Sequence, residues 1–151
     1  MPGPLVHVGY ALSRRGVPAA ASFRQWVATA LAGARHGKPA ELSIRIVGAR
    51  EGRALNRRYR DRDYATNVLS FPAELPPGMR SPLLGDIVIT APVLAHEARE
   101  QGKSPRDHYA HLTVHGVLHL LGYDHRGERD AAKMERLETR ILASLGIADP
   151  Y

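Results

Sequence analysis

The sequence of 151 residues contains no cysteine. Disulfide bonds and thiolate metal sites are therefore excluded, and the composition fits a reducing compartment. No run of apolar residues approaches the roughly 18–20 that a membrane-spanning helix needs. The N-terminal stretch MPGPLVHVGYALSRRG has neither the basic start nor the long apolar run of a secretory signal peptide. We therefore expect a cytoplasmic protein without a membrane partner.

Acidic residues are scarce relative to basic ones. The chain has 15 Asp and Glu against 21 Lys and Arg, a formal net charge of +6. The excess is concentrated between Arg50 and Arg62, where six arginines stand against two acids. This distribution suits a polyanionic partner such as nucleic acid. An arginine-rich helix that only faces solvent would have the same composition, so charge alone leaves both interpretations open.

The chain also lacks internal repeats, linkers and low-complexity segments. Its hydrophobic residues (44%) and charged residues (24%) are those of an ordinary globular protein. The length fits one domain, residues 1–151, that is large enough to bury a core of its own.

Hydrophobic periodicity predicts both strands and helices. The strands are expected at residues 5–12, 40–48, 67–72 and 83–90. The helices are expected at residues 18–37, 49–60, 91–102, 104–122 and 128–146, with Ser104 as an N-cap. Strands and helices interleave early and helices dominate late. This order indicates an α+β fold, a small mixed β-sheet covered by helices.

Three of these helices have a predicted orientation. The buried face of the first consists of Phe23, Trp26, Val27, Ala30 and Leu31. The buried face of the last consists of Met134, Leu137, Ile141, Leu142 and Leu145. In the helix at 49–60, Arg50, Arg53, Arg57 and Arg60 share one side, and Leu55 and Tyr59 share the other.

Half of the eight histidines lie in the stretch HLTVHGVLHLLGYDH. His111, His115 and His119 lie one turn apart on a helix, but His111 and His119 are about 12 Å apart along its axis and cannot bind one ion. Two imidazoles at about 2.0–2.1 Å from one ion require an i, i+4 pair. Gly122 can end the helix in a left-handed conformation, so that His125 returns toward its last turns. The predicted ligands are therefore His115, His119 and His125.

Three neutral nitrogen ligands leave a fourth position open, which is typical of a catalytic site. One zinc ion is expected, and imidazole also suits other transition metals. The spacing around Gly122 matches the zincin-like metalloprotease signature H-E-x-x-H-x-x-G-x-x-H at every position but one. Gly116 stands where the proteases have the glutamate that takes the proton of water. Peptide hydrolysis is therefore disfavoured.

The blocks HGVLHLLGYDH, YRDRDYATNVLSFP and LLGDIVI together resemble the YbeY family of bacterial endoribonucleases, the rRNA maturation factors. The likeness runs from about Leu42 to Leu145, and its one departure is YAT, where a proline often precedes the threonine. It implies a single-domain metalloprotein with one zinc ion on the three histidines. It also implies single-strand cleavage in 16S rRNA 3′-end maturation and ribosome quality control. The implied partner is the ribosome or its small-subunit precursor.

The family's functionally important arginine corresponds to Arg60. Cleavage of a phosphodiester needs stabilisation of charge on the phosphorus oxygens, and a guanidinium is a planar, permanently charged donor. We assign this catalytic role to Arg60, acting beside the metal ligand His115. Arg53 and Arg57, together with Arg60, are expected to contact RNA phosphates.

Further candidates surround this centre. By strand alternation, Val68 and Ser70 face the cleft, with Ser70 as an RNA contact, whereas Leu69 and Phe71 belong to the core. Asp124 could orient a ligand imidazole, and Asp86 could do the same or transfer a proton. A role in a turn explains each aspartate equally well. The sequence does not identify the group that replaces the missing glutamate.

Two other classes of protein compete with the endoribonuclease. The first is a non-catalytic ribosome-assembly factor whose zinc only fixes the C-terminal fold, and the open fourth position argues against it. The second is a metalloprotease with an unusual base, which Gly116 and the concentration of arginines disfavour. The leading hypothesis is a metal-dependent endoribonuclease.

Overall fold

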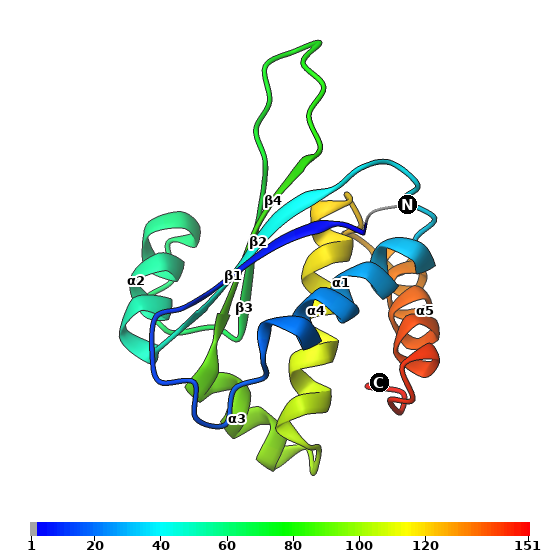
Figure 1. Cartoon of the computed structure of the whole chain (residues 1–151). Helices are drawn as coiled ribbons and strands as arrows, with labels where there is room; N and C mark the ends of the chain where they lie inside the picture. Colours follow the sequence, from blue (N-terminus) through cyan, green and yellow to red (C-terminus); the bar gives the residue numbers. More distant parts are fainter. Residues whose placement is uncertain (1–2) are drawn as a thin grey trace.

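The computed structural model describes residues 3–151 (Figure 1). In chain order the elements are β1 (Leu5–Tyr10), α1 (Ala20–Gly33), β2 (Glu41–Val47), α2 (Ala49–Arg60), β3 (Val68–Pro72), β4 (Leu83–Thr90), α3 (Ala91–Glu100), α4 (Pro105–Leu120) and α5 (Glu128–Ser144). Every predicted element is present, and the ends differ by a few residues. Helix α1 begins at Ala20 rather than Pro18, because the backbone of Ala19 is still extended, with ψ 158°.

The four strands form one mixed sheet in the order β1-β2-β4-β3. β1, β2 and β4 are parallel, whereas β3 at the edge runs antiparallel to β4. Helices α1, α4 and α5 lie on one face of the sheet and α2 lies on the other side (Figure 1). The connection between β3 and β4 extends beyond the helices (Figure 1). The predicted α+β fold with a small mixed sheet is confirmed.

The main core lies between the sheet and the three helices α1, α4 and α5. Leu42, Ile44 and Ile46 of β2 alternate into it and are at most 1% exposed. The predicted face of α1 is buried as a whole, and that of α5 is buried except for the partly buried Leu145. Hydrophobic periodicity therefore assigned these faces correctly, since each element buries one continuous stripe.

The predicted orientation of α2 holds for its exposed arginines and for Leu55, which packs against a second core cluster of Val47, Leu69 and Val88, but not for Tyr59. The buried residues of the helix are Gly52 and Asn56, whereas Tyr59 is 56% exposed. Gly52 lies so close to Thr90 that an added Cβ would come within 2.4 Å of its Oγ1. Asn56 donates a hydrogen bond from Nδ2 to the carbonyl of Tyr64 at 2.8 Å. The close contact of Gly52, the hydrogen bond of Asn56 and the packing of Leu55 against the second core cluster hold this helix against the sheet.

Helix α4 is the central element and is buried on most of its circumference. Its N-terminus is capped as predicted, because the Ser104 hydroxyl accepts a hydrogen bond from the backbone N–H of Asp107 at 3.1 Å. At its other end Gly122 has φ +99°, and the N–H of Tyr123 donates to the carbonyl of Leu118 at 3.0 Å. This six-to-one bond reverses the chain directly after the helix. Within residues 3–151 no helix is long and apolar enough to cross a membrane.

Candidate metal centre

The three predicted ligands converge at the C-terminal end of α4. His115 and His119 are one turn apart on the helix, and His125 lies in the connection to α5 that follows the glycine turn. One potential ligand atom from each ring lies within 4.8 Å of the other two. The rings of His115 and His125 are stacked, with centroids 5.1 Å apart. The local reversal at Gly122 therefore brings His125 back to the helix.

The donor atoms fit one transition-metal ion. Nε2 of His115 and Nε2 of His119 are 3.1 Å apart, and two nitrogens on a tetrahedral zinc are separated by about 3.3–3.4 Å. Burial, followed by the charges of His115 and His125, lowers the pKa of His119. His119 is therefore neutral at neutral pH, which is the form that binds a metal ion.

Gly116 lies on the side of α4 that packs against the sheet. A Cβ at this position would come within 3.0–3.2 Å of three side-chain atoms of Ile87. A glutamate here would have to displace a fully buried isoleucine of β4. The close approach of helix and sheet therefore favours glycine at this position.

A buried acid that the sequence analysis missed lies behind His115. Oε1 of Glu138, on α5, is 2.5 Å from Nδ1 of His115, and its other oxygen is 3.3 Å from Nε2 of His111. The hydroxyl of Tyr151 also donates to this carboxylate. Because His115 uses Nδ1 toward Glu138, its Nε2 is free to face His119. This is the arrangement in which a carboxylate fixes the tautomer and orientation of a metal-ligating imidazole.

Glu138 is fully buried and still ionised. Burial alone would raise its pKa, but the hydrogen bonds from His111, His115 and Tyr151 outweigh it and hold the pKa at about 2. Glu138 lies on the Nδ1 side of His115, away from the other two ligands, and its oxygens are already occupied. It orients the ligand and does not replace the proteases' proton-accepting glutamate.

The sequence did contain a signal for Glu138. It occupies a position within the apolar stripe of α5, four residues after Met134 and three before Ile141. An acid in a buried stripe is rare unless it is paired. The signal indicates a buried partner, but it does not say which of the histidines that partner is.

We expect Glu138→Gln to weaken metal binding by about 10- to 100-fold, the usual cost of losing such an outer partner. The side chain keeps its shape and loses the charge that fixes the imidazole. Competition titration against a chelator measures the affinity. Glu135→Gln on the same helix is the matched control, and equal affinities for both variants would contradict the role of Glu138.

His111, His115 and Glu138 form a second cluster with the spacing of a metal site. The carboxylate of Glu138 lies within hydrogen-bonding distance of a ring nitrogen of each histidine. Hydrogen bonds from the two rings account for these contacts without an ion. His111 thus remains outside the ligand set and contacts it only through Glu138.

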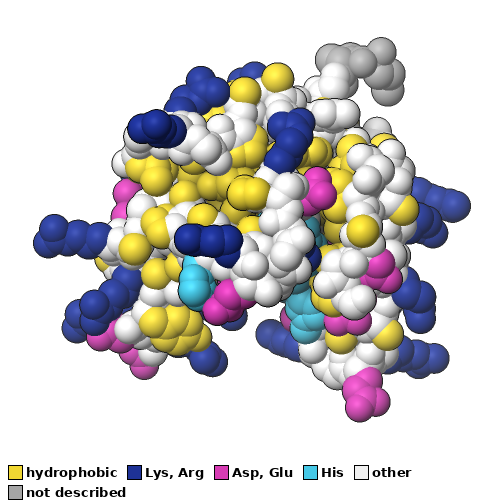
Figure 2. Space-filling model, turned by 90° about the horizontal axis from the view of Figure 1, so that it is seen from below, with side chains coloured by type: hydrophobic (Ala, Val, Ile, Leu, Met, Phe, Trp, Pro, Cys, Tyr) yellow, Lys and Arg dark blue, Asp and Glu magenta, His cyan; other side chains and the backbone are white. Residues whose placement is uncertain are grey.

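The triad opens into a cleft of about 560 Å³ between α4, the end of α2 and strand β3. Arg60 and Tyr59 of α2, Ser70 of β3, and Asp124 line it together with the three histidines. The Ser70 hydroxyl lies 3.5 Å from the carbonyl of Gly116. Lysine and arginine side chains project along both sides of the face seen in Figure 2, and histidine side chains are visible between them.

Not all the predicted site residues reach this cleft. Arg53 and Arg57 are exposed on α2 and do not line it. Asp86 lies on the strand face opposite Ile87 and accepts a hydrogen bond from the hydroxyl of Ser43. Its carboxylate is therefore not brought to the metal ligands, and we do not retain it in the site.

Asp124 does reach the cleft, but its hydrogen bond is to the backbone. Oδ1 accepts from the N–H of His125 at 2.7 Å, and Oδ2 lies 3.0 Å from Nε of Arg126. Asp124 fixes the turn that carries His125 and does not contact the imidazole. Of the two roles left open by the sequence, this contact favours the turn.

Sequence reasoning also missed five residues of the cleft. They are Tyr59, Thr66 and Asn67, together with Leu69 and Phe71, which pack in the second core cluster as expected but also line the cleft. Asn67 is held in place, since its Nδ2 donates to Glu97 at 3.1 Å and its Oδ1 accepts from the N–H of Val68 at 2.6 Å. Tyr59 was expected on the side of α2 opposite the arginines. Its exposed ring packs edge-on against Phe71, with centroids 5.0 Å apart.

Fold and site together define a class: an α+β protein in which three histidines of zincin-like spacing, able to hold a metal ion, lie in a cleft that also contains an arginine. Residues 15–146 match the sequence profile of the family described as Endoribonuclease YbeY. A protein of that name from Stenotrophomonas maltophilia is 63% identical over 150 residues, covering 97% of this chain and 92% of the relative. The chain belongs to the Endoribonuclease YbeY family.

Two further comparisons agree. A protein named Endoribonuclease YbeY from Xanthomonas axonopodis pv. citri is 61% identical over 150 residues, covering 97% of this chain and 92% of its own. The solution structure of a protein from Thermotoga maritima superposes with a TM-score of 0.58 at 20% identity. That superposition covers 97% of this chain and 98% of the other, and it supports the fold.

Proposed function

We propose that this chain is a metal-dependent endoribonuclease that hydrolyses phosphodiester bonds of single-stranded RNA. One observation carries the proposal: the three histidines and Arg60, from separate parts of the chain, line the same cleft. The family name of its relatives supports the activity. From the family resemblance we infer a cytoplasmic role in 16S rRNA 3′-end maturation and ribosome quality control. The partner would be the ribosome or its small-subunit precursor.

In this proposal the residues of the cleft have different roles. One zinc ion on His115, His119 and His125 would supply Lewis acidity toward a phosphoryl oxygen and an attacking water, and another transition metal could do the same. Arg60 donates hydrogen bonds to the phosphorus oxygens as their charge develops. Ser70 contacts the RNA strand from the opposite wall. The exposed ring of Tyr59 offers a surface on which a base can stack.

Two features disfavour the competing functions. Gly116 cannot accept a proton, and a side chain at this position would require Ile87 to shift by a few tenths of an ångström. Both properties of Gly116 argue against a protease. Arg60 lies beside the histidines in an open cleft and forms no ion pair within residues 3–151. A purely structural zinc site does not need such an arginine.

Cleavage of single-stranded RNA by metal-depleted and metal-restored protein tests the proposal. We expect activity to disappear on depletion and to return with zinc or another transition metal. An assembly factor would cleave no RNA in either state, and metal depletion would affect only its fold. A protease would instead turn over casein in the restored state.

Arg57 and Arg53 are expected to differ in their contribution to RNA binding. Arg53 forms a two-pronged ion pair with Asp63, with N–O distances of 2.8 and 3.0 Å, whereas Arg57 forms none within the described residues. Each phosphate contact contributes about −0.7 to the slope of log affinity against log salt for single strands. We expect Arg57→Gln to flatten the slope by about 0.7 and Arg53→Gln to change it less. An unchanged slope in Arg57→Gln would make Arg57 a solvated surface residue.

A further inference from the structure

A second basic surface lies between α5 and the end of α1, away from the arginines of α2. We call it the α5 groove; it is lined by Arg35, Lys133, Arg136 and Arg140, with Tyr123, Leu137, Gly33 and Ala34. Its volume is about 310 Å³, and all four cationic side chains are exposed. No acidic residue lines it. The proposed chemistry of the histidine cleft makes no use of it.

The fold builds this groove from two distant segments. Lys133, Arg136 and Arg140 follow one another at helical spacing and share a face of α5. Gly33 of α1 packs so closely on α5 that an added Cβ would meet Ile141 at 2.5 Å. That contact brings the end of α1, and with it Arg35, to the same face.

Arg35 holds its place at a conformational cost. Its φ of +57° lies in the left-handed region, where glycine is the usual residue after a helix. Non-glycine residues in this region are strained and persist where the surrounding structure or a function requires them. Glycine at position 35 would adopt this backbone conformation without strain. The geometry of the turn therefore does not explain why the residue is an arginine.

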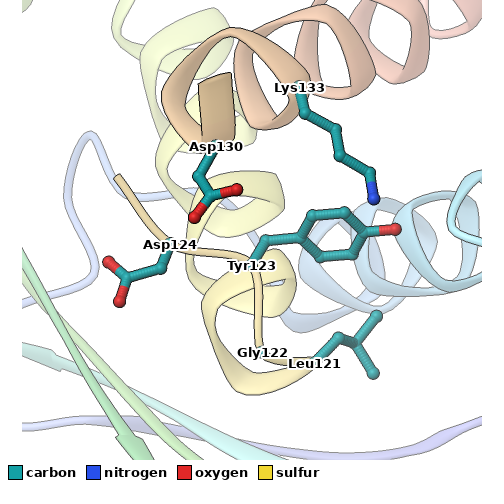
Figure 3. A pocket seen from close by; sticks show the side chains of 6 residues that line it. All are labelled: Leu121, Gly122, Tyr123, Asp124, Asp130 and Lys133. Carbon is teal, nitrogen blue, oxygen red and sulfur yellow. The ribbon is translucent and has the colours of Figure 1, made fainter. Parts of the chain in front are cut away.

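The charges of the groove are not compensated. Within residues 3–151 none of its four cations forms an ion pair. Like charges three and four residues apart on a helix repel one another. In Figure 3 the ammonium of Lys133 and the hydroxyl of Tyr123 point to one side, whereas the carboxylates of Asp124 and Asp130 point to the other. The groove therefore concentrates positive charge for an anion from outside the chain.

The groove and the histidine cleft are neighbours of one intermediate cavity, which shares lining residues with each. Asp124 lines both the cleft and a cavity of about 300 Å³ behind the metal turn (Figure 3). Tyr123 and Lys133 line both that cavity and the α5 groove. A strand that leaves the cleft must pass the carboxylates of Asp124 and Asp130, which point away from Lys133, and then meets the ring of Tyr123 and a row of cations. An aromatic ring beside a row of cations is the combination that binds single-stranded nucleic acid without sequence preference.

We propose that the α5 groove binds backbone phosphates of the same single-stranded RNA, beyond the bond that is cleaved, with a base against Tyr123. This inference rests on the proposed function. It assigns Lys133, Arg136, Arg140 and Arg35 to substrate binding and none of them to the chemistry. RNA that occupies only the cleft does not reach these residues, so their effect depends on the length of the strand.

The test compares Lys133→Gln/Arg136→Gln/Arg140→Gln with a control that loses the same charge elsewhere, Arg15→Gln/Arg80→Gln/Arg99→Gln. Binding is measured by fluorescence anisotropy with chelator present, so that RNA is not cleaved. The probes are RNAs of about 4 and about 16 nucleotides, the range of single-strand site sizes. We expect the groove variant alone to lose affinity for the long RNA, with its salt slope flattened by up to about two units. Affinity for the short RNA should not change.

Equal behaviour of the groove and control variants, or equal loss on both RNAs, would overturn the inference. Wild-type protein that cleaves RNA normally in that case would leave the proposed function intact. Wild-type protein that neither binds nor cleaves RNA would contradict both. Selective loss of binding to an acidic peptide would assign the groove to a protein partner instead.

Arg35→Gly is a second, independent variant. Glycine suits the left-handed backbone, so the melting temperature should stay the same or rise. Affinity for the long RNA should fall, because one cation of the groove is gone. A variant that is as stable as wild type and binds the long RNA equally well would remove Arg35 from the site.

Discussion

His119→Ala should lose the bound metal ion, whereas His111→Ala should keep it. Purified wild-type protein is expected to contain one transition-metal ion per chain, because the ligand atoms of His115, His119 and His125 form one compact set. Removing a ligand should cost more than the roughly 10–100-fold that an outer partner is worth. Metal content after dialysis, measured by atomic emission, separates the two variants.

His111 is a demanding control. It lies one turn from His115 on the same helix and contacts Glu138 at 3.3 Å. If the cluster of His111, His115 and Glu138 held the ion instead, His111→Ala would lose the metal and His119→Ala would keep it. That result, or equal metal loss in both variants, would make our ligand set wrong. A second readout does not depend on activity. Chelation should lower the melting temperature of wild type and His111→Ala but not that of His119→Ala, since ligand binding stabilises only the state that binds.

Arg60→Lys should slow cleavage by about 10- to 1000-fold while RNA affinity and metal content stay near normal. Lysine keeps the charge and loses the planar fork, so the variant tests geometry rather than net electrostatics. A donor that meets charge developing on the phosphorus oxygens contributes more in the transition state than in the bound substrate. The expected loss corresponds to about 1.4–4 kcal/mol, the scale of one oriented donor.

Single-turnover cleavage at saturating RNA measures this effect apart from binding. Arg58→Lys is the matched control, because Arg58 lies on the same helix and does not line the cleft. A normal cleavage rate combined with weaker affinity in Arg60→Lys would make Arg60 a phosphate anchor. The donor that stabilises the transition state would then have to be another group of the cleft.

Local interactions explain why much of the site could be predicted. The pair His115 and His119 follows from helical spacing, and the return of His125 follows from a glycine turn whose hydrogen bonds span six residues. The capped start of α4 and the faces of α1 and α5 were predictable for the same reason. In each case the residues that decide the geometry lie within a few positions of one another.

By itself, then, the sequence determined the α+β class, the convergence of His115, His119 and His125, and the concentration of positive charge. Only the tertiary structure decided that Glu138 lies behind His115, that Arg60 joins the histidines in one cleft and that Asp86 does not. The tertiary structure also decided that Gly52 and Asn56 are the buried residues of α2 and that Tyr59 is exposed. These contacts join residues 23 to about 60 positions apart. Such distances are set by how whole elements pack, because periodicity specifies which face of an element is buried but not which partner it meets.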